Sequence, residues 1–220
     1  MAFVDWIFNK SATITASIDV VNPPIAGNAS LLIDMTTSGA DTKINATTTD
    51  TNVNFPKGFT KGKIRTLFKV IASAATEKTF GLSAMQSQGS IFSSTGSFYV
   101  ARVTVGTSGF VSKIELMKNI SNTGLVGLTT VLGTHTVSIS ASTVFSLELQ
   151  WIYDAVELQG TNLIVRLGYA TDFSDLGQII TVTDLLNYRS TSVAEGIFGT
   201  CPSTGTMKLL VEGTTLYELV

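Results

Sequence analysis

Regular alternation of apolar and polar residues is the feature that most restricts the fold of this chain. In the segment Ser11–Val20 every second residue is apolar, and the residues between them are Ser, Thr or Asp. A period of two places one face of a β-strand on a core and the other face toward water or a neighbour. Pro23 and Pro24 end this segment, because proline has no N–H to donate to a ladder.

The same alternation recurs along the chain. It predicts further strands in the segments LLIDMTT, KIRTLFKVIAS, KTFGLSAM, FYVARVTV, FVSKIELM, HTVSISA, VFSLELQWIY, NLIVRLGY, QIITVTD, MKLLVEG and TLYELV. Turn sequences such as SQGS, GTSG, SNTG and STGT separate them. Roughly a dozen short strands without a long helical pattern predict an all-β sandwich or barrel. We expect an antiparallel two-sheet jelly-roll sandwich over residues 11–220, preceded by an N-terminal arm, residues 1–10.

The composition limits what this sandwich binds. Charged residues make up 14% of the chain, against about 25% in ordinary soluble domains, so its polar surface consists mostly of Ser, Thr, Asn and Gly. Such a surface suits an extracellular medium or burial against partner subunits. The net charge is −2, and the densest basic residues alternate with Gly and apolar groups: Lys57, Lys61, Lys63, Arg65 and Lys69. This pattern favours an edge strand protected by lysines over a nucleic-acid interface.

The cysteine content and the apolar runs indicate in which cellular compartment the chain folds. Cys201 is the only cysteine, so it forms no internal disulfide and fits assembly in a reducing compartment. The first ten residues lack a continuous apolar run, and Ser, Thr, Asn and Gly interrupt the uncharged span between Asn119 and Leu147. We therefore expect neither a standard secretory leader nor a membrane-spanning helix.

The N-terminal arm is rich in large apolar side chains: Phe3, Trp6, Ile7 and Phe8. Exposed aromatic residues at a terminus would promote aggregation. They therefore either fold back on their own sandwich as a lid or dock on a neighbouring subunit.

The segment Leu147–Tyr169 contains two of the predicted strands. In the first, Leu147, Leu149 and Trp151 share one face, and Glu148 and Gln150 lie on the other. If the two strands form a hairpin, Arg166 of the second strand lies opposite Glu148 or Gln150. An exposed cross-strand pair of this kind stabilises a sheet by roughly 0.2–1 kcal/mol.

This region resembles the concanavalin-A-like sandwich of laminin-G and legume-lectin type. The resemblance covers Val144 to Asp184 and rests on the rhythm LELQWIYD, then GTNLIVRLGY, then the acidic loop and strand ATDFSDLGQIITVTD. It implies a jelly roll, and in that family calcium sites lie on such loops. Composition also resembles that of tailed-phage virion proteins, which are rich in Thr, Ser and Gly and poor in Cys and His.

The acidic, histidine and cysteine residues of the chain do not have the spacing of known catalytic motifs. Retaining glycosidases on this sandwich carry an acidic pair on one strand in the form Glu-x-Asp-x-x-Glu, which Glu148, Asp154 and Glu157 do not match. His135 is the only histidine, and no Gly-x-Ser-x-Gly motif accompanies it. A cysteine nucleophile at Cys201 has no local support, so the sequence favours a protein that is not an enzyme.

Asp172 and Asp175 are weak calcium ligands at most. Calcium takes six to eight oxygens, whereas Asx residues stabilise turns without an ion. We therefore expect no metal and no cofactor.

Two functional hypotheses follow. The first is a self-associating structural protein of a virion, a capsid decoration protein or a fibre or spike subunit, assembled in the host cytoplasm as a homo-oligomer, with a trimer as the expected symmetry. Its partners would be copies of itself and other virion proteins such as a capsid lattice. The alternative is a lectin-like module that binds glycan on aromatic residues, for which the candidates are Tyr99, Tyr153, Tyr169 and Tyr188.

Overall fold

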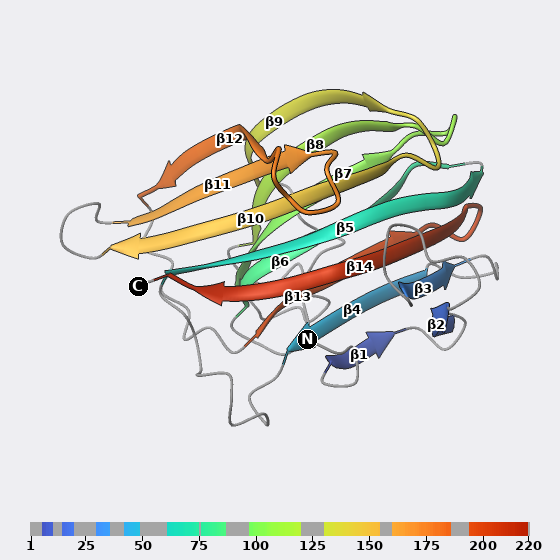
Figure 1. Ribbon diagram of the computed structural model, residues 1–220, viewed down its shortest axis with the longest axis horizontal. Helices are drawn as coiled ribbons and strands as arrows, with labels where there is room; N and C mark the ends of the chain where they lie inside the picture. Colours follow the sequence, from blue (N-terminus) through green and yellow to red (C-terminus); the bar gives the residue numbers. More distant parts are fainter. Residues whose placement is uncertain are drawn as a thin grey trace.

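The computed structural model is a β-sandwich of two seven-stranded sheets (Figure 1). It describes residues 6–10, 15–19, 30–35, 42–48, 61–74, 76–86, 97–119, 130–154, 160–185 and 194–219. All strand pairs within each sheet are antiparallel. None of the described residues form a helix of the length and apolar character that a membrane crossing requires. The predicted all-β jelly-roll sandwich is confirmed.

Sheet A contains strands from both ends of the chain. Its order is β1 (Trp6–Lys10), β4 (Thr42–Thr48), β13 (Ala194–Cys201), β6 (Lys78–Gln86), β7 (Phe98–Val105), β8 (Val111–Asn119) and β9 (Thr130–Ile139). Sheet B has the order β12 (Gly177–Asp184), β11 (Gly160–Gly168), β10 (Val144–Asp154), β5 (Lys61–Ala74), β14 (Thr206–Glu218), β3 (Ser30–Met35) and β2 (Thr15–Asp19).

The residues expected to form an N-terminal arm belong in part to sheet A. Residues 6 to 10 form the edge strand β1, and its backbone pairs with β4 from Trp6 opposite Thr48 to Lys10 opposite Ile44. Phe3 lies outside the described residues. The contacts of the β1 side chains are not among those described, so their docking on a second copy stays a prediction.

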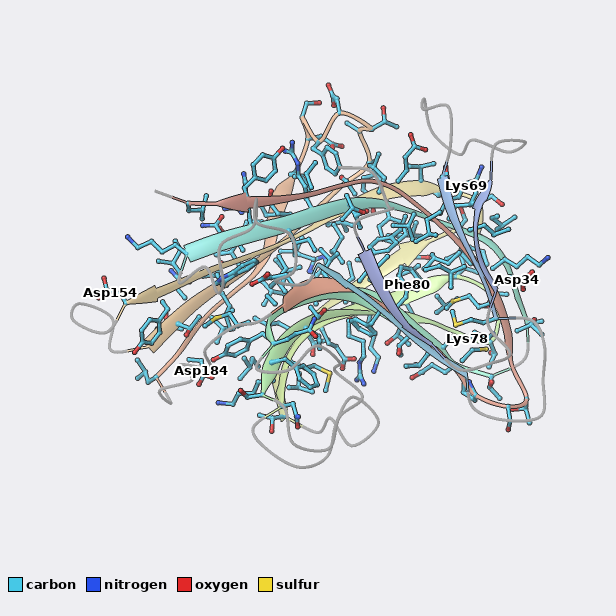
Figure 2. The ribbon with its side chains drawn as sticks, turned by 90° about the horizontal axis from the view of Figure 1, so that it is seen from below. Asp34, Lys69, Lys78, Phe80, Asp154 and Asp184 are labelled. Atoms are coloured by element: carbon cyan, nitrogen blue, oxygen red, sulfur yellow. The ribbon has the colours of Figure 1, made fainter. Side chains whose placement is uncertain are left out.

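The core between the sheets is built from the alternating apolar residues. Phe68 of β5, Phe80 of β6 and Phe145 of β10 are buried together, with ring centroids 4.9 to 6.1 Å apart. Figure 2 shows Phe80 between the two layers. Burying one such side chain contributes roughly 1.5–3 kcal/mol, so the ring cluster fixes the two sheets face to face.

Trp151 of β10 fills the core beside a glycine. It is fully buried and pairs with Gly62 of β5. A Cβ at Gly62 would lie 2.5 Å from Cζ2 of Trp151. The absent side chain at Gly62 therefore makes the space that the indole ring occupies.

A buried ion pair joins the two sheets at one end of the sandwich. The Nζ of Lys118 on β8 donates to both carboxylate oxygens of Asp184 on β12, at 2.8 and 2.9 Å. The hydroxyl of Tyr99 on β7 donates to the same carboxylate at 2.9 Å. The side chains of Lys118 and Asp184 are only 5% and 6% exposed, so both charges are compensated away from water.

A second buried amine lies at the opposite end, where Figure 2 labels Lys78 far from Asp184. The Nζ of Lys78 on β6 donates to Ser73 Oγ of β5 at 2.9 Å. Burial lowers the pKa of Lys78 because it disfavours the charged form, and the neighbouring Cys201 raises it in part. Cys201 ends strand β13, and its side chain is buried.

Candidate functional site on the outer face of sheet A

Of the four tyrosines expected to face glycan, the three that the structure describes do not gather on one surface. Tyr99 is buried between the sheets, so its assignment to an exposed face was wrong: its position on β7 points inward toward Asp184. Tyr153 is half-buried and packs against the core. Tyr169 follows β11 and is 52% exposed, whereas Tyr188 lies outside the described residues.

Asp172 and Asp175 organise the loop between β11 and β12. Asp175 accepts hydrogen bonds from the backbone N–H groups of Tyr169 and Ala170, and Asp172 accepts one from that of Ser174. Hydrogen bonds from the side chain and then the backbone of Ser174 favour the charged carboxylate of Asp172 and lower its pKa, and the backbone bonds from Tyr169 and Ala170 lower the pKa of Asp175. Within the described part of the chain, no three His, Cys, Asp or Glu side chains converge as a metal site would need. Both aspartates therefore have a structural explanation as turn residues.

The predicted pair between β10 and β11 is confirmed. Glu148 and Arg166 lie directly opposite each other, and Arg166 Nη1 is 2.6 Å from Glu148 Oε1 and 2.7 Å from Gln150 Oε1. Lys63 of β5 adds a second cation 3.6 Å from Glu148. The carboxylate is only 4% exposed, so this group is more buried than the alternation predicted.

On the outer face of sheet B, several polar side chains already have partners within the chain. Arg65 is held between two aromatic rings, with its guanidinium carbon 4.4 Å from the centroid of Phe173 and 4.9 Å from that of Tyr217. It also donates to Thr215 Oγ1 and to Tyr217 Oη. Phe173 belongs to the loop between β11 and β12, which crosses in front of sheet B in Figure 1. This loop therefore closes part of that face.

The outer face of sheet A carries polar side chains in rows across neighbouring strands. Residues directly opposite in an antiparallel pair point to the same side. The register of β13, β6, β7, β8 and β9 therefore aligns one row, Thr200, Thr79, Thr104, Lys113 and Thr136. The next row contains Arg102, Glu115 and Thr134, with Gly81 beside Arg102. We call these two rows the polar strip.

Glu115 of β8 lies at the centre of the polar strip. Arg102 of β7 donates to Glu115 Oε2 from Nε at 3.2 Å and from Nη2 at 2.7 Å. Lys113 donates to the other oxygen, Oε1, at 3.3 Å. The carboxylate is 7% exposed, whereas the Arg102 and Lys113 side chains are 21% and 35% exposed. The anion is thus covered, and the two cations remain partly open to solvent.

Some polar atoms on this face have unmet hydrogen-bonding capacity. Thr104 Oγ1 is buried without a partner, as is Gln86 Oε1, although Gln86 donates to Ser83 Oγ from its other end. Leaving a buried polar group unpaired costs about 1–3 kcal/mol. A buried water would remove that cost.

The polar strip borders a separate apolar cluster on the same sheet. Phe98, Val100, Met117 and Phe198 are all at most 2% exposed and form this cluster. In Figure 2 both sheets bend in the same sense, with sheet A beneath sheet B, so the outer face of sheet A lies on the inner side of the bend. The strip therefore combines hydroxyl, cationic and carboxylate groups on a curved surface.

Sequence reasoning overlooked the polar strip. Arg102 and Thr104 alternate with apolar residues in FYVARVTV, and Lys113 and Glu115 do so in FVSKIELM. The alternation indicates that each set shares a face of its own strand. Only the register between β7 and β8 shows that the two sets meet.

Comparisons with known proteins agree on the fold. No family model matches the chain, and no curated protein matches its sequence. Among solved structures, the marine PL-14 alginate lyase from Aplysia kurodai superposes with a TM-score of 0.62 at 10% identity, covering 99% of this chain and 92% of the other. The endo-β-1,4-glucuronan lyase from Trichoderma reesei gives 0.56 at 11%, with coverage of 97% and 90%. The carbohydrate recognition domain of Emp46p, in its metal-free form, gives 0.53 at 11%, with coverage of 99% and 90%.

These similarities define the class of fold. The chain is an antiparallel jelly-roll sandwich of concanavalin-like type, as the resemblance in Val144–Asp184 implied. The same fold occurs in a carbohydrate recognition domain, in an alginate lyase and in a glucuronan lyase.

Proposed function

We propose that this protein is a carbohydrate-binding module without catalytic activity, and that the polar strip of sheet A contacts the saccharide. The observation that carries the proposal is the alignment of Thr hydroxyls with Arg102, Lys113 and Glu115 on the inner side of the bend. Saccharides present many hydroxyl groups, which both donate and accept hydrogen bonds. A strip of hydroxyls and charged groups complements that chemistry.

The absence of catalysis is part of the proposal. Hydrolysis of a glycosidic bond uses two carboxyl groups flanking that bond. In the described part of the polar strip, Glu115 is the one carboxylate, and both its oxygens receive hydrogen bonds from cations. This arrangement favours holding a ligand over transferring protons to it.

Binding to a printed array of neutral and acidic oligosaccharides tests the proposal. We expect the native protein to bind at least one group of glycans. Lys113→Met should weaken that binding about tenfold, which corresponds to 1.4 kcal/mol. Lys69→Met is the matched control, because Lys69 is a half-buried lysine on the outer face of sheet B. No binding, or an equal loss in both variants, would refute the proposal.

A second proposal is a self-associating structural subunit of a virion, such as a capsid decoration protein or a fibre or spike subunit. Exposed apolar side chains favour it: Leu185 is 67% exposed, Val131 is 45% exposed and Phe110 is 44% exposed. Covering such side chains with a second copy would remove apolar surface from water, which favours association. Light scattering on the full chain should give a multiple of 23.3 kDa, with a trimer as our expectation, and a monomer at all concentrations would refute self-association. Deleting residues 1–10 is a poor test, because it removes β1 and uncovers an edge of β4.

A further inference from the structure

We infer that the saccharide is acidic and that Arg102 binds its anionic group, a carboxylate or a sulfate. This inference rests on the proposed function of the polar strip and adds the chemical class of the ligand. It rests on the hydrogen-bond donors and acceptors of the polar strip that are not used in bonds within the strip.

The only carboxylate in the described strip is already occupied. Glu115 Oε2 accepts two N–H groups from Arg102, and Oε1 accepts one from Lys113. Its side chain is 7% exposed. Glu115 therefore orients the two cations and leaves little room for a ligand hydroxyl to donate to it.

The two cations retain donors that their bonds to Glu115 do not use, and both side chains are partly exposed. A guanidinium carries five N–H groups and Arg102 directs two of them at Glu115, which leaves three. An ammonium carries three and Lys113 directs one at Glu115, which leaves two. The three groups together sum to a charge of +1, from two cations and one anion. The strip is thus donor-rich and positively charged, and it complements a ligand that supplies acceptors and negative charge.

The geometry of arginine also favours an anionic group. Its planar fork binds carboxylate or sulfate oxygens through two parallel hydrogen bonds, which are stronger than neutral ones. Arg102 is held in place by the Glu115 bond, so little side-chain entropy is lost when a ligand binds. Exposed Thr134 and Thr136 lie on β9 beside Glu115 and Lys113, where they can bond the ring hydroxyls of the same saccharide.

The test compares oligosaccharides that differ only in charge. Uronate oligomers are compared with the same oligomers with methyl-esterified carboxyls, and sulfated oligomers with the same oligomers without sulfate; each is titrated into the native protein by calorimetry. We expect uronate or sulfated oligomers to bind at least tenfold more tightly than their uncharged counterparts, and this preference to fall as salt is raised, because exposed charges are screened. The stronger of the two acidic series identifies the anionic group.

Two variants test whether Arg102 causes the preference for acidic oligosaccharides. Arg102→Gln should reduce the ratio of acidic to neutral affinity to near one, whereas Arg166→Gln, which changes a paired arginine on sheet B, should keep the ratio. If Arg102→Gln does not fold, Lys113→Gln serves instead and should lower the ratio at least threefold. Equal affinity for acidic and neutral oligomers would overturn this inference and leave the proposed function standing. Failure to bind any oligosaccharide would overturn the proposed function itself, and an unchanged ratio in Arg102→Gln would show that the anion binds elsewhere.

Discussion

The buried ion pair between Lys118 and Asp184 makes a quantitative prediction about stability. Asp184→Ala removes the carboxylate and leaves the Lys118 ammonium enclosed, with its side chain 5% exposed. Removing one partner from a buried pair costs about 3–5 kcal/mol, because the remaining charge is uncompensated. The Tyr99 hydroxyl also loses an acceptor. In a chain of this size about 1 kcal/mol lowers Tm by roughly 2–4 °C, so a decrease of about 6–20 °C is expected.

A double-substitution cycle separates the uncompensated charge from simple loss of packing. Lys118→Met with Asp184→Leu replaces both charges by apolar groups of similar size, and such replacements of buried pairs are often neutral or stabilising. The double variant should therefore lie within about 1.5 kcal/mol of the native protein, well above Asp184→Ala. Urea unfolding followed by circular dichroism measures all the variants. A cost below about 1 kcal/mol for Asp184→Ala, or a double variant less stable than the single one, would refute the reasoning.

Other features lead to predictions of the same kind. Gly62→Ala should destabilise the protein by about 1–3 kcal/mol, because its methyl group would overlap the Trp151 ring. Urea unfolding measures this loss of stability, and an unchanged unfolding midpoint would contradict the packing described. Glu148→Gln should cost about 1.5–3 kcal/mol by weakening its charged bond with Arg166, and thermal unfolding without a decrease in Tm would show that the pair contributes nothing. The pKa of Asp175 is lower in the folded than in the unfolded chain. Its bonds therefore stabilise the loop above the ordinary carboxyl pKa and are lost as pH falls through the lowered one. NMR titration of this carboxyl should give a midpoint below that of a free aspartate, and an ordinary midpoint would argue against those bonds.

The strands most clearly predicted by sequence are those with one buried face. The alternation in VFSLELQWIY and NLIVRLGY gave β10 and β11 together with the Glu148–Arg166 pair, because a register set by buried apolar residues leaves few alternatives. The two predicted strands MKLLVEG and TLYELV are one strand, β14, interrupted by a bulge between Glu212 and Thr215. Gly213 has a φ of +62° in that bulge, a conformation that glycine adopts without strain. A glycine between two alternating segments resembles a turn in sequence, which is why two strands were predicted.

Three strands were not predicted at all: β1, which lies in the expected N-terminal arm, and the strands β4 and β13. The segment of β13, AEGIFGTC, contains two glycines, and that of β4, TKINATT, is mostly polar. Both are stabilised by pairing with neighbours distant in the chain, β13 with β4 and β6. Local propensity carries no record of such pairings.

The candidate site was hidden for the same reason. Arg102 and Glu115 are 13 residues apart in the chain, and each has an ordinary place on the polar side of its own strand. Their meeting depends on the register of β7 against β8, which the turn between them fixes. Tyr99 shares its face of β7 with the apolar residues Ala101, Val103 and Val105, so the alternation itself indicated that this tyrosine points into the core.

The most direct test of the account is an NMR titration of isotope-labelled protein with uronate oligomers, in which the amide signals are followed strand by strand. The account predicts that shifts concentrate on β6, β7, β8 and β9 around Arg102 and Lys113, with little change on β5, β10 and β14. Shifts confined to the outer face of sheet B, or no shifts with any acidic or neutral oligosaccharide, would contradict it.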